Sequence, residues 1–190
     1  MEFERINALT ISHHIVSMAV KKGDICIDAT AGRGNDTVFL CSLVGENGRV
    51  LSFDIQDEAI ESTVNAVKEN GFENIADIRK CSHSDMDKFA QKDSVACIMF
   101  NFGWLPGGNH NIHTQAQTSI EAIEKGLELL RDGGVMSLCI YYGKETGFEE
   151  RDALLEYFKT IECRKASVLV CDFVNRPNCP AIGVFIFKGK

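Results

Sequence analysis

The sequence lacks the features that mark membrane, secreted and repetitive proteins. No apolar run approaches the ~18 residues that a membrane-spanning helix needs. The N-terminal MEFERINALT has no basic segment followed by an apolar stretch, so we expect no signal peptide. An internal repeat, a low-complexity tract and a linker rich in proline or serine are also absent. These absences predict a cytoplasmic protein that does not enter a membrane.

Paired cysteines and clusters of metal ligands are absent as well. None of the eight cysteines forms a C-x-x-C pair, and most lie in apolar runs such as DICIDAT, VACIMF and MSLCIYY. A buried cysteine in a reducing compartment behaves as a small hydrophobic residue. The pairs His13–His14 and His110–His113 have no carboxylate or thiol at metal-ligand spacing. We therefore expect neither disulfides nor a metal site.

Positive charge is in deficit, with 20 Lys and Arg against 27 Asp and Glu and a net charge of −7. Such a chain does not coat nucleic acid unspecifically, although a local basic patch can still hold one particular RNA. The rest of the composition, 45% hydrophobic and 25% charged, is typical of a globular protein. We expect a single domain over residues 1–190, in which a helix within residues 1–22 covers the pocket.

Apolar residues recur with helical spacing in some segments and in short continuous runs in others. The helical spacing predicts helices over residues 7–20, 36–44, 57–70, 84–89, from Thr114 or Thr118 to 130, and 149–160. Strands are predicted over residues 24–28, 49–54, 76–80, 95–100, 135–142, 165–173 and 182–187. Turns containing glycine are expected at residues 45–48 and 131–134.

The alternation of strands and helices predicts a parallel, doubly wound sheet, because each helix must cross back over a face of the sheet. The last two strands have only about eight residues between them and no helix, so they should pair antiparallel. This pattern is similar to that of the class I S-adenosylmethionine-dependent methyltransferases. It implies an α/β, Rossmann-like fold with a seven-stranded, mostly parallel sheet, an antiparallel last strand and helices on both faces.

The loop after the first strand, DATAGRGNDT, lies where doubly wound sheets bind ligands. Gly32 and Gly34 allow the backbone to pass close to a ligand. A dinucleotide fingerprint would need glycine where Thr37 stands, and Asp36 would repel a pyrophosphate at the helix N-terminus. An amino acid moiety suits the loop better, because Asp28 or Asp36 can accept hydrogen bonds from its ammonium group. The alternative is a tight turn with solvated acids.

Polar residues follow the next two strands at the same edge of the sheet. Asp54 ends the second strand, twenty residues after Gly34, and is placed to accept hydrogen bonds from both ribose hydroxyls. Ser82 and His83 follow the third strand and should border the adenine. The sequence therefore favours S-adenosylmethionine over a dinucleotide.

The loop after the fourth strand reads NFGWLPGGNH from Asn101. In amino-group methyltransferases of this fold, an Asn or Asp ends this strand and is followed by small and aromatic residues. The Asn101 side-chain oxygen and the carbonyls of Phe102 and Gly103 are thus expected to accept hydrogen bonds from a target amine. Neutral acceptors can hold the free amine, or lower the pKa of an alkylammonium from about 10.4. Alternatively, Trp104 and Leu105 belong to the core and the Pro-Gly-Gly segment is only a turn.

Two further segments should face the same pocket. After the fifth strand, Tyr141 or Tyr142 could stack on a nucleobase and Lys144 could contact a phosphate, with a solvated loop as the equal alternative. His13 and His14 are expected on the N-terminal helix that covers the pocket.

Five segments together resemble a known family: DATAGRGNDTVFL, FDIQDEAIESTVNAV, FNFGWLPGGNHNIHTQAQTSIEAIEKGLELLRDGG, YYGKETGFEE and NRPNCP. They are similar to the small bacterial YtqB-type, or MnmM-type, tRNA methyltransferases over nearly the whole chain. The resemblance implies methylation of the 5-aminomethyl group of 5-aminomethyl-2-thiouridine at the tRNA wobble position. It also implies a tRNA anticodon stem-loop as the partner. Lys144 stands where the family has a histidine, and Trp104 where it has a tyrosine.

The resemblance also implies roles for individual residues. Asn101 and Gly103 would be catalytic, between the cofactor and the amine. The predicted cofactor-binding residues are Asp28, Ala29, Thr30, Gly32, Gly34, Asn35, Asp36, Thr37, Asp54, Ile55, Gln56, Ser82, His83 and Asn101. The predicted substrate-binding residues are Trp104, Pro106, His110, Tyr142 and Lys144.

Other functions compete with this one. An enzyme of the same fold could methylate another RNA base, as in rRNA, or a small-molecule amine. A nucleotide-binding module without catalysis and a dinucleotide-dependent oxidoreductase are the other classes, the latter disfavoured by Asp36 and Thr37. We also expect a homodimer, since one small domain offers little surface for holding a stem-loop.

Overall fold

The computed structural model of the chain describes residues 6–103, 114–143 and 147–189. Its helices are α1 (Ala8–Ala19), α2 (Asn35–Val44), α3 (Asp57–Glu69), the 3-10 helix η1 (His83–Lys88), α4 (Ala116–Leu129) and α5 (Phe148–Thr160). Its strands are β1 (Ile25–Asp28), β2 (Arg49–Asp54), β3 (Ala76–Lys80), β4 (Val95–Phe102), β5 (Leu130–Ile140), β6 (Ala166–Cys171) and β7 (Ile182–Lys188).

The strands form one seven-stranded sheet in the order β3-β2-β1-β4-β5-β7-β6. The pairs from β3 to β5 are parallel, whereas β7 pairs antiparallel with both β5 and β6. The last strand is therefore inserted between β5 and β6 and runs against the other six. The predicted Rossmann-like fold class, with its antiparallel last strand, is confirmed.

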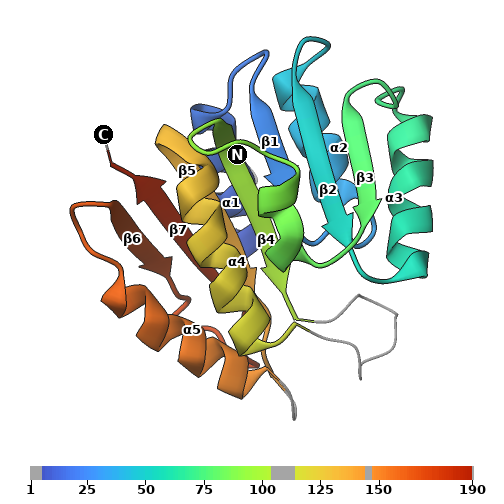
Figure 1. Cartoon of the computed structure of the whole chain (residues 1–190). Coiled ribbons are helices and arrows are strands. Elements are labelled where there is room, and N and C mark those ends of the chain that lie inside the picture. The colour runs from blue at the N-terminus through green and yellow to red at the C-terminus, as the bar shows by residue number, and fades with distance from the viewer. Residues whose placement is uncertain (1–5, 104–113, 144–146, 190) are drawn as a thin grey trace, which may run out of the picture.

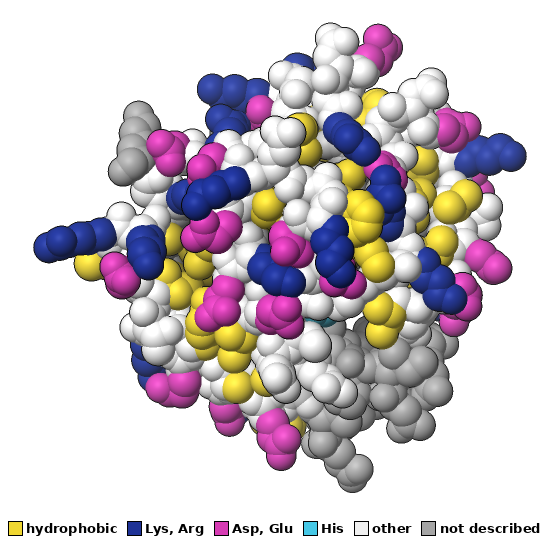
Figure 2. Space-filling model, viewed as in Figure 1, with side chains coloured by type: hydrophobic (Ala, Val, Ile, Leu, Met, Phe, Trp, Pro, Cys, Tyr) yellow, Lys and Arg dark blue, Asp and Glu magenta, His cyan; other side chains and the backbone are white. Residues whose placement is uncertain are grey.

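Helices cover both faces of the sheet, as Figure 1 shows with η1, α4 and α5 in front of the strands and α1 and α2 behind them. Each face has its own apolar core. The front core contains Phe53, Phe100 and Phe102 together with residues of α4 and α5. The rear core packs Val16 of α1 and Leu40 of α2 against the sheet. Charged side chains of both signs are interspersed over the front surface (Figure 2).

The strand order reverses between β1 and β4. The chain passes from β1 outward to β2 and β3, and then returns to pair β4 on the other side of β1. Helices that follow these strands diverge, which leaves a crevice at the carboxyl ends of β1 and β4. The sheet topology alone thus places the candidate site at this edge.

The turn predicted at residues 131–134 is part of a strand. β5 begins at Leu130, and its pairing with β4 shifts register between Val95 and Cys97. Gly133 has a φ of +72°, and a Cβ on Gly134 would lie 2.9 Å from the Arg131 carbonyl oxygen. The two glycines therefore lie in a register irregularity at the start of β5 and do not form a separate turn after α4.

Four of the eight cysteines are buried: Cys26, Cys41, Cys97 and Cys139. Each of these thiols has its pKa raised by burial, in agreement with a role as a small core residue. Cys163 is exposed, and Cys81, Cys171 and Cys179 are partly buried. No helix in the described part of the chain is both long and apolar enough to cross a membrane.

Gly34 is required where α2 meets α3. Its φ is +81°, and a Cβ there would lie 2.9 Å from the Thr63 Cα and 3.1 Å from the Ala66 Cβ. Gly71, in contrast, has a φ of +72°, and no atom lies within 4 Å of the place that a Cβ would take. A comparison of Gly34 with Gly71 therefore separates the cost of backbone strain from the cost of steric overlap.

We expect Gly34→Ala to lower the free energy of unfolding by about 2–4 kcal/mol, because overlap adds to backbone strain. Gly71→Ala should cost only about 1–2 kcal/mol, from the strain alone. Urea unfolding of the two variants and the parent chain measures the difference. Equal losses of unfolding free energy in the two variants would show that α3 moves away from the added Cβ at residue 34 without an energetic cost.

Candidate functional site

A cavity of about 640 Å³ opens at the carboxyl edge of the sheet. Residues from the ends of β1, β2, β4 and β5 form its walls, together with the starts of η1 and α4 and one residue of α1. Its lining consists of Leu9, Ala29, Thr30, Ala31, Gly32, Arg33, Asn35, Asp36, Phe53, Asp54, Ile55, Gln56, Cys81, Ser82, His83, Asn101, Gly103, Thr114, Gln115, Thr118 and Tyr141.

The structure brings most of the predicted site residues together in this lining. They are Ala29, Thr30, Gly32, Asn35, Asp36, Asp54, Ile55, Gln56, Ser82, His83, Asn101 and Gly103. Four others in the described part of the chain do not line it: Asp28, Gly34, Thr37 and Tyr142. The residues Trp104, Pro106, His110 and Lys144 lie outside the described residues, as does His113.

Asp28 lies beneath the cavity wall and is fully buried. Its Oδ2 accepts a hydrogen bond of 2.6 Å from the Thr37 hydroxyl, which also lies 2.9 Å from the Ser52 hydroxyl. The Thr30 N–H lies 3.3 Å from Asp28 Oδ1. Asp28 therefore joins the end of β1 to α2 and β2, and of the two acids considered for an ammonium group only Asp36 reaches the cavity.

Burial raises the pKa of Asp28 to about 7, and the neighbouring Asp36 carboxylate adds to the effect. Between pH 4 and pH 7 the folded protein thus keeps a proton that the unfolded chain has lost. The contribution of Asp28 to stability falls as pH rises through this range, by at most about 1.4 kcal/mol per pH unit.

Asp28→Asn should remove this pH dependence. We expect the parent chain to lose about 1–2 kcal/mol more stability than the variant between pH 5 and pH 7. Urea unfolding at the two pH values measures both differences. An equal loss in the two proteins would contradict a raised pKa at Asp28.

Asp54 is held by the backbone of two loops. Its Oδ2 accepts a hydrogen bond of 3.0 Å from Gly32 N–H, and its Oδ1 accepts one of 3.0 Å from Gln56 N–H. Each oxygen retains a second lone pair for another donor. The carboxylate is therefore fixed in the cavity wall with capacity for two further hydrogen bonds, which matches a ribose diol.

Asn101, Asp36 and His13 form a chain of hydrogen bonds in the wall of the cavity. The Asn101 amide Nδ2 donates to Asp36 Oδ2 over 2.7 Å, and His13 Nε2 lies 2.7 Å from Asp36 Oδ1. His13 is fixed in turn by stacking on Phe39, with ring centroids 3.9 Å apart. The Thr30 hydroxyl accepts a hydrogen bond from Asn101 N–H at 2.7 Å.

This chain of hydrogen bonds determines which atom Asn101 offers to a ligand. A carboxylate only accepts hydrogen bonds, so the amide nitrogen must be the atom that faces Asp36. The side-chain oxygen Oδ1 is then directed away from Asp36, and no described residue donates to it. Asn101 therefore presents a neutral acceptor at the cavity lining, and its role toward an amine stays a prediction.

The two backbone carbonyls predicted to act beside Asn101 are already engaged. The Phe102 oxygen accepts a hydrogen bond of 2.9 Å from Tyr141 N–H in the β4–β5 ladder. The Gly103 oxygen accepts one of 3.0 Å from Thr114 N–H. Each carbonyl oxygen keeps a second lone pair for another donor, so the expectation that both accept hydrogen bonds from an amine stays a prediction.

A buried carboxylate joins the two ends of the segment between Gly103 and Thr114. Gly103 N–H donates to the Thr114 hydroxyl over 2.8 Å, and that hydroxyl donates to Glu150 Oε2 over 2.7 Å. The other oxygen of Glu150 accepts a hydrogen bond of 2.7 Å from Ser119 in α4. Gly103 has a φ of +141°, and a Cβ there would lie 3.0 Å from the Tyr141 Cβ. Glu150 thus fixes the wall beside Asn101.

Of the two tyrosines considered for stacking on a base, Tyr141 lines the cavity. Burial raises the pKa of its phenol, which therefore stays protonated and can donate a hydrogen bond. Tyr142 instead packs edge-on against Phe148, with Arg151 4.6 Å from its ring centroid. Tyr142 does not line the cavity, and its contact with the substrate stays a prediction.

His83 lines the cavity from the start of η1. Its ring packs edge-on against Phe100 and Phe102, with centroids 6.1 Å apart in both pairs. Burial lowers its pKa, so the ring is neutral at physiological pH. His83 thus supplies an uncharged aromatic wall on the side expected for the adenine. No three His, Cys, Asp or Glu side chains of the described residues gather into a metal-binding group.

The sequence did not identify several lining residues as part of the site. Leu9 reaches the cavity because an N-terminal capping box at Asn7 begins α1, and a buried contact of 2.6 Å between Ser12 and Ser137 fixes that helix on β5. Gln115 and Thr118 come from the start of α4. Their position just after a strand-end loop was a usable signal, whereas no local pattern connects α1 with the site.

Comparison with known proteins relates the chain to methyltransferases. Residues 50–187 match the family described as “Putative rRNA methylase”. A curated relative from Arabidopsis thaliana, “tRNA (mnm(5)s(2)U34)-methyltransferase, chloroplastic”, is 34% identical over 98% of this chain and 71% of its own length.

Two solved structures share the whole fold. A “putative rRNA-methylase” from Clostridium thermocellum superimposes with a TM-score of 0.95 at 46% identity, over 98% of this chain and 100% of that chain. A “putative methyltransferase” from Streptococcus mutans, solved in complex with S-adenosylhomocysteine, gives a TM-score of 0.88 at 32% identity, over 97% and 99% of the two chains.

Proposed function

The chain belongs to the family described as “Putative rRNA methylase” and is an S-adenosylmethionine-dependent methyltransferase, and we propose that it methylates the 5-aminomethyl group of (2-thio)uridine at the wobble position of tRNA. The family membership confirms the resemblance seen in the sequence. The observation that carries the proposed reaction is the Asn101 side-chain oxygen, a neutral acceptor oriented by Asp36 at the cavity lining.

The cavity fits the methyl donor at its two ends. Asp54, fixed by two backbone N–H groups, has the remaining acceptor capacity that a ribose diol requires. Ile55, Ser82 and His83 line the part assigned to the adenine. Asp36 lies at the first turn of α2, beside the glycine loop, and is the acid placed to hold the methionyl ammonium group.

When bound, S-adenosylmethionine supplies an electrophilic methyl group: the amine nitrogen bonds to its carbon, the carbon–sulfur bond breaks with its electron pair left on sulfur, and a methylated ammonium group results. Only the neutral amine has the lone pair that this requires. Asn101 Oδ1 can accept a hydrogen bond from that amine. Positioning of the amine is then the main contribution of the chain to the rate.

Asp36 and His13 act on the substrate through Asn101. The Asp36 carboxylate fixes which atom of the amide faces the amine, and His13 fixes the carboxylate. We assign a positioning role to His13, whereas Asp36 both orients Asn101 and is proposed to contact the methyl donor. His13 belongs to α1, so this helix contributes to the site as well as covering it.

We propose the tRNA anticodon stem-loop as the partner and the cytoplasm as the place of action. The tRNA substrate is supported by the activity for which the Arabidopsis relative is named. Tyr141, which lines the cavity and has 38% of its surface exposed, is an aromatic side chain available to a nucleobase.

Mass spectrometry of tRNA nucleosides tests the proposed reaction. The purified chain is incubated with S-adenosylmethionine and tRNA carrying 5-aminomethyl-2-thiouridine, with tRNA lacking the aminomethyl group as the control. We expect conversion of this nucleoside to its methylaminomethyl form and no change in the control. Methyl transfer to an rRNA base or to a small-molecule amine, with the aminomethyl nucleoside unchanged, would contradict the tRNA substrate but leave the methyltransferase activity in place.

A further inference from the structure

A buried carboxylate lies behind one side of the cavity. Glu150 is only 6% exposed and lines neither the cavity nor any other described pocket. In the described part of the chain it forms no ion pair, and its two oxygens accept hydrogen bonds from the hydroxyls of Thr114 and Ser119. Thr114 belongs to the amine side of the cavity, the part that the proposed function assigns to the amine, formed by Asn101, Gly103, Thr114 and Tyr141.

Stability alone does not explain a carboxylate at this position. Burial of a carboxylate without a cation beside it costs free energy, and an apolar side chain of similar size would pack there at less cost. Two hydroxyl donors and the N-terminal N–H groups of α5, in whose first turn Glu150 lies, compensate part of this cost. A carboxylate offers two acceptors in fixed directions, which an apolar side chain does not. The residue type therefore indicates a geometric role.

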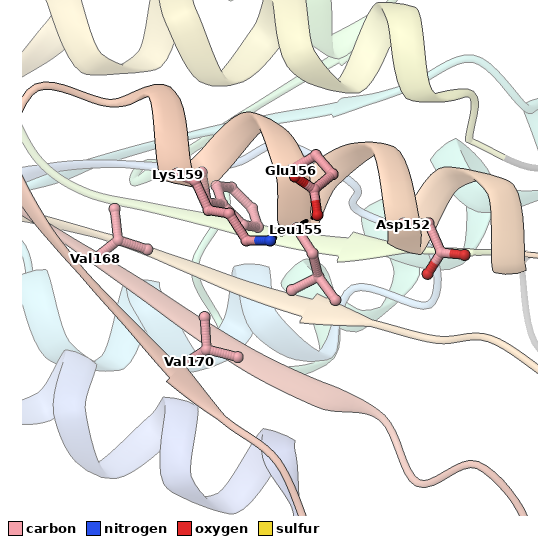
Figure 3. A pocket seen from close by; sticks show the side chains of 7 residues that line it. Asp152, Leu155, Glu156, Lys159, Val168 and Val170 are labelled. Atoms are coloured by element: carbon pink, nitrogen blue, oxygen red, sulfur yellow. Dashed lines mark hydrogen bonds and ion pairs between the residues drawn. The ribbon is translucent and has the colours of Figure 1, made fainter.

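The packing of α5 fixes the helix that carries Glu150. Leu154 and Phe158 of this helix are buried in the front core. On its outer side, Leu155 is directed toward β6, where α5 and β6 enclose a separate groove of about 430 Å³ (Figure 3). The helix is thus held against the sheet on both of these sides, and Glu150 extends from a fixed support.

The Thr114 hydroxyl connects Glu150 to the end of β4. It donates to Glu150 Oε2 over 2.7 Å and accepts a hydrogen bond of 2.8 Å from Gly103 N–H. Thr114 N–H donates in return to the Gly103 carbonyl oxygen over 3.0 Å. A hydroxyl has only one proton. Because that proton lies toward the carboxylate, a lone pair must face Gly103 N–H, so Glu150 determines that Thr114 acts as the acceptor for Gly103.

Gly103 transmits this contact to the amine side of the cavity. It follows Asn101 by two residues, has a φ of +141°, and would place a Cβ 3.0 Å from the Tyr141 Cβ. Between them, Phe102 pairs with Tyr141 N–H in the sheet. Rotation of the backbone at Gly103 would therefore displace both Asn101 and Tyr141. The two hydrogen bonds to Thr114 oppose that rotation.

We propose that Glu150 is a positioning residue for methyl transfer, which acts through Thr114 and Gly103 to fix the amine side of the cavity relative to the methyl donor. Asp36 orients the Asn101 side chain, and Glu150 holds the backbone that follows it. The inference rests on the proposed function, because it requires an amine beside Asn101. Glu150 does not line the cavity, so its effect on the reaction passes through Thr114.

Two variants of Thr114 test the contact with the smallest change. Thr114→Val removes the hydroxyl but keeps the shape of the side chain, and Thr114→Ser keeps the hydroxyl. We expect Thr114→Val to lower the single-turnover rate of tRNA methylation about tenfold. Calorimetry should find its affinity for S-adenosylhomocysteine within about threefold of the parent, because the contacts of Asp54 are unchanged. Thr114→Ser should recover the rate to within about threefold.

Replacement of Glu150 separates positioning from stability. Glu150→Met removes both acceptors and should lower the rate about tenfold, without a matching loss of stability in urea unfolding. Glu150→Gln should recover most of the rate, because its amide oxygen can still accept from Thr114 while its N–H group donates to Ser119. Glu149→Met, at an exposed acid in the same turn of α5, is the matched control and should stay within about twofold.

Hydrogen exchange of backbone amides, followed by NMR without any substrate, tests the contact independently of the reaction. Glu150→Met should speed exchange of the Gly103 amide about tenfold. The Tyr141 amide, which pairs with Phe102 in the sheet, should keep its rate within about twofold.

Three results would overturn the role of Glu150. They are full turnover in Glu150→Met, an equal loss in Glu149→Met, and a loss of S-adenosylhomocysteine affinity as large as the loss of rate, which would mean general damage to the cavity. Should Glu150→Met fail to fold, the Thr114 variants decide the question. If the parent chain leaves the aminomethyl nucleoside unmethylated, the proposed function is wrong. The exchange rate of the Gly103 amide still tests whether Glu150 holds the end of β4, and an unchanged rate would reject it.

Discussion

Replacing Asn101 with alanine is expected to lower turnover roughly 100-fold or more, while the affinity for S-adenosylhomocysteine changes by less than about tenfold. The variant removes the neutral acceptor assigned to the amine but leaves the Asp54 end of the cavity unchanged. Single-turnover methylation of tRNA measures the first effect, and calorimetry with S-adenosylhomocysteine measures the second.

Two further variants distinguish this role from a general disturbance of the cavity. Gln115→Ala removes another polar side chain of the lining and should change turnover by only a few-fold. Asn101→Asp keeps the size of the side chain but sets a carboxylate against Asp36, so it should be as impaired as the alanine variant. Activity that survives in Asn101→Ala would show that this side chain does not hold the amine.

The second large effect is expected at Asp54. Asp54→Ala should weaken binding of S-adenosylhomocysteine about 100-fold, because it removes a charged acceptor of the ribose and leaves the N–H groups of Gly32 and Gln56 without their partner. Calorimetry measures the dissociation constant directly.

Asp57→Ala is the matched control for this experiment. Asp57 is a neighbouring acid at the start of α3 whose carboxylate is 76% exposed and pairs with Lys80. Its removal changes the net charge equally but should leave the affinity within about twofold. Equal losses in the two variants would indicate a general electrostatic effect instead of a hydrogen-bonded ribose.

The residues at the ends of the strands could be assigned to the site from the sequence, because in α/β folds the carboxyl ends of parallel strands meet at one edge of the sheet. Gly32, Asp54 and Asn101 each follow an apolar strand, and parallel strands direct their carboxyl ends to one edge. Their convergence in one cavity therefore follows from the order of elements. The bounds of β2 and β3 also agree with the predicted strands. For β2 the reason is a short, mostly apolar run bounded by polar residues.

The orientation of individual side chains was not predictable in the same way. Asp28 and Asp36 are acids at the two ends of one loop, but the first is buried under Thr37 and only the second faces the cavity. Tyr141 and Tyr142 are adjacent at a strand end, and α5 packs over the second of them. Adjacent residues in extended backbone point to opposite sides, so an error of one residue reverses the assignment.

Hydrophobic periodicity and turn residues act over a few positions. They were therefore enough to predict the class of fold, the edge of the sheet that holds the site and the strand-end residues around it. Only the tertiary structure placed His13 on Asp36, Glu150 on Thr114 and β7 between β5 and β6. These are contacts between residues far apart in the chain. Their geometry depends on how whole helices and strands pack, which no local pattern encodes.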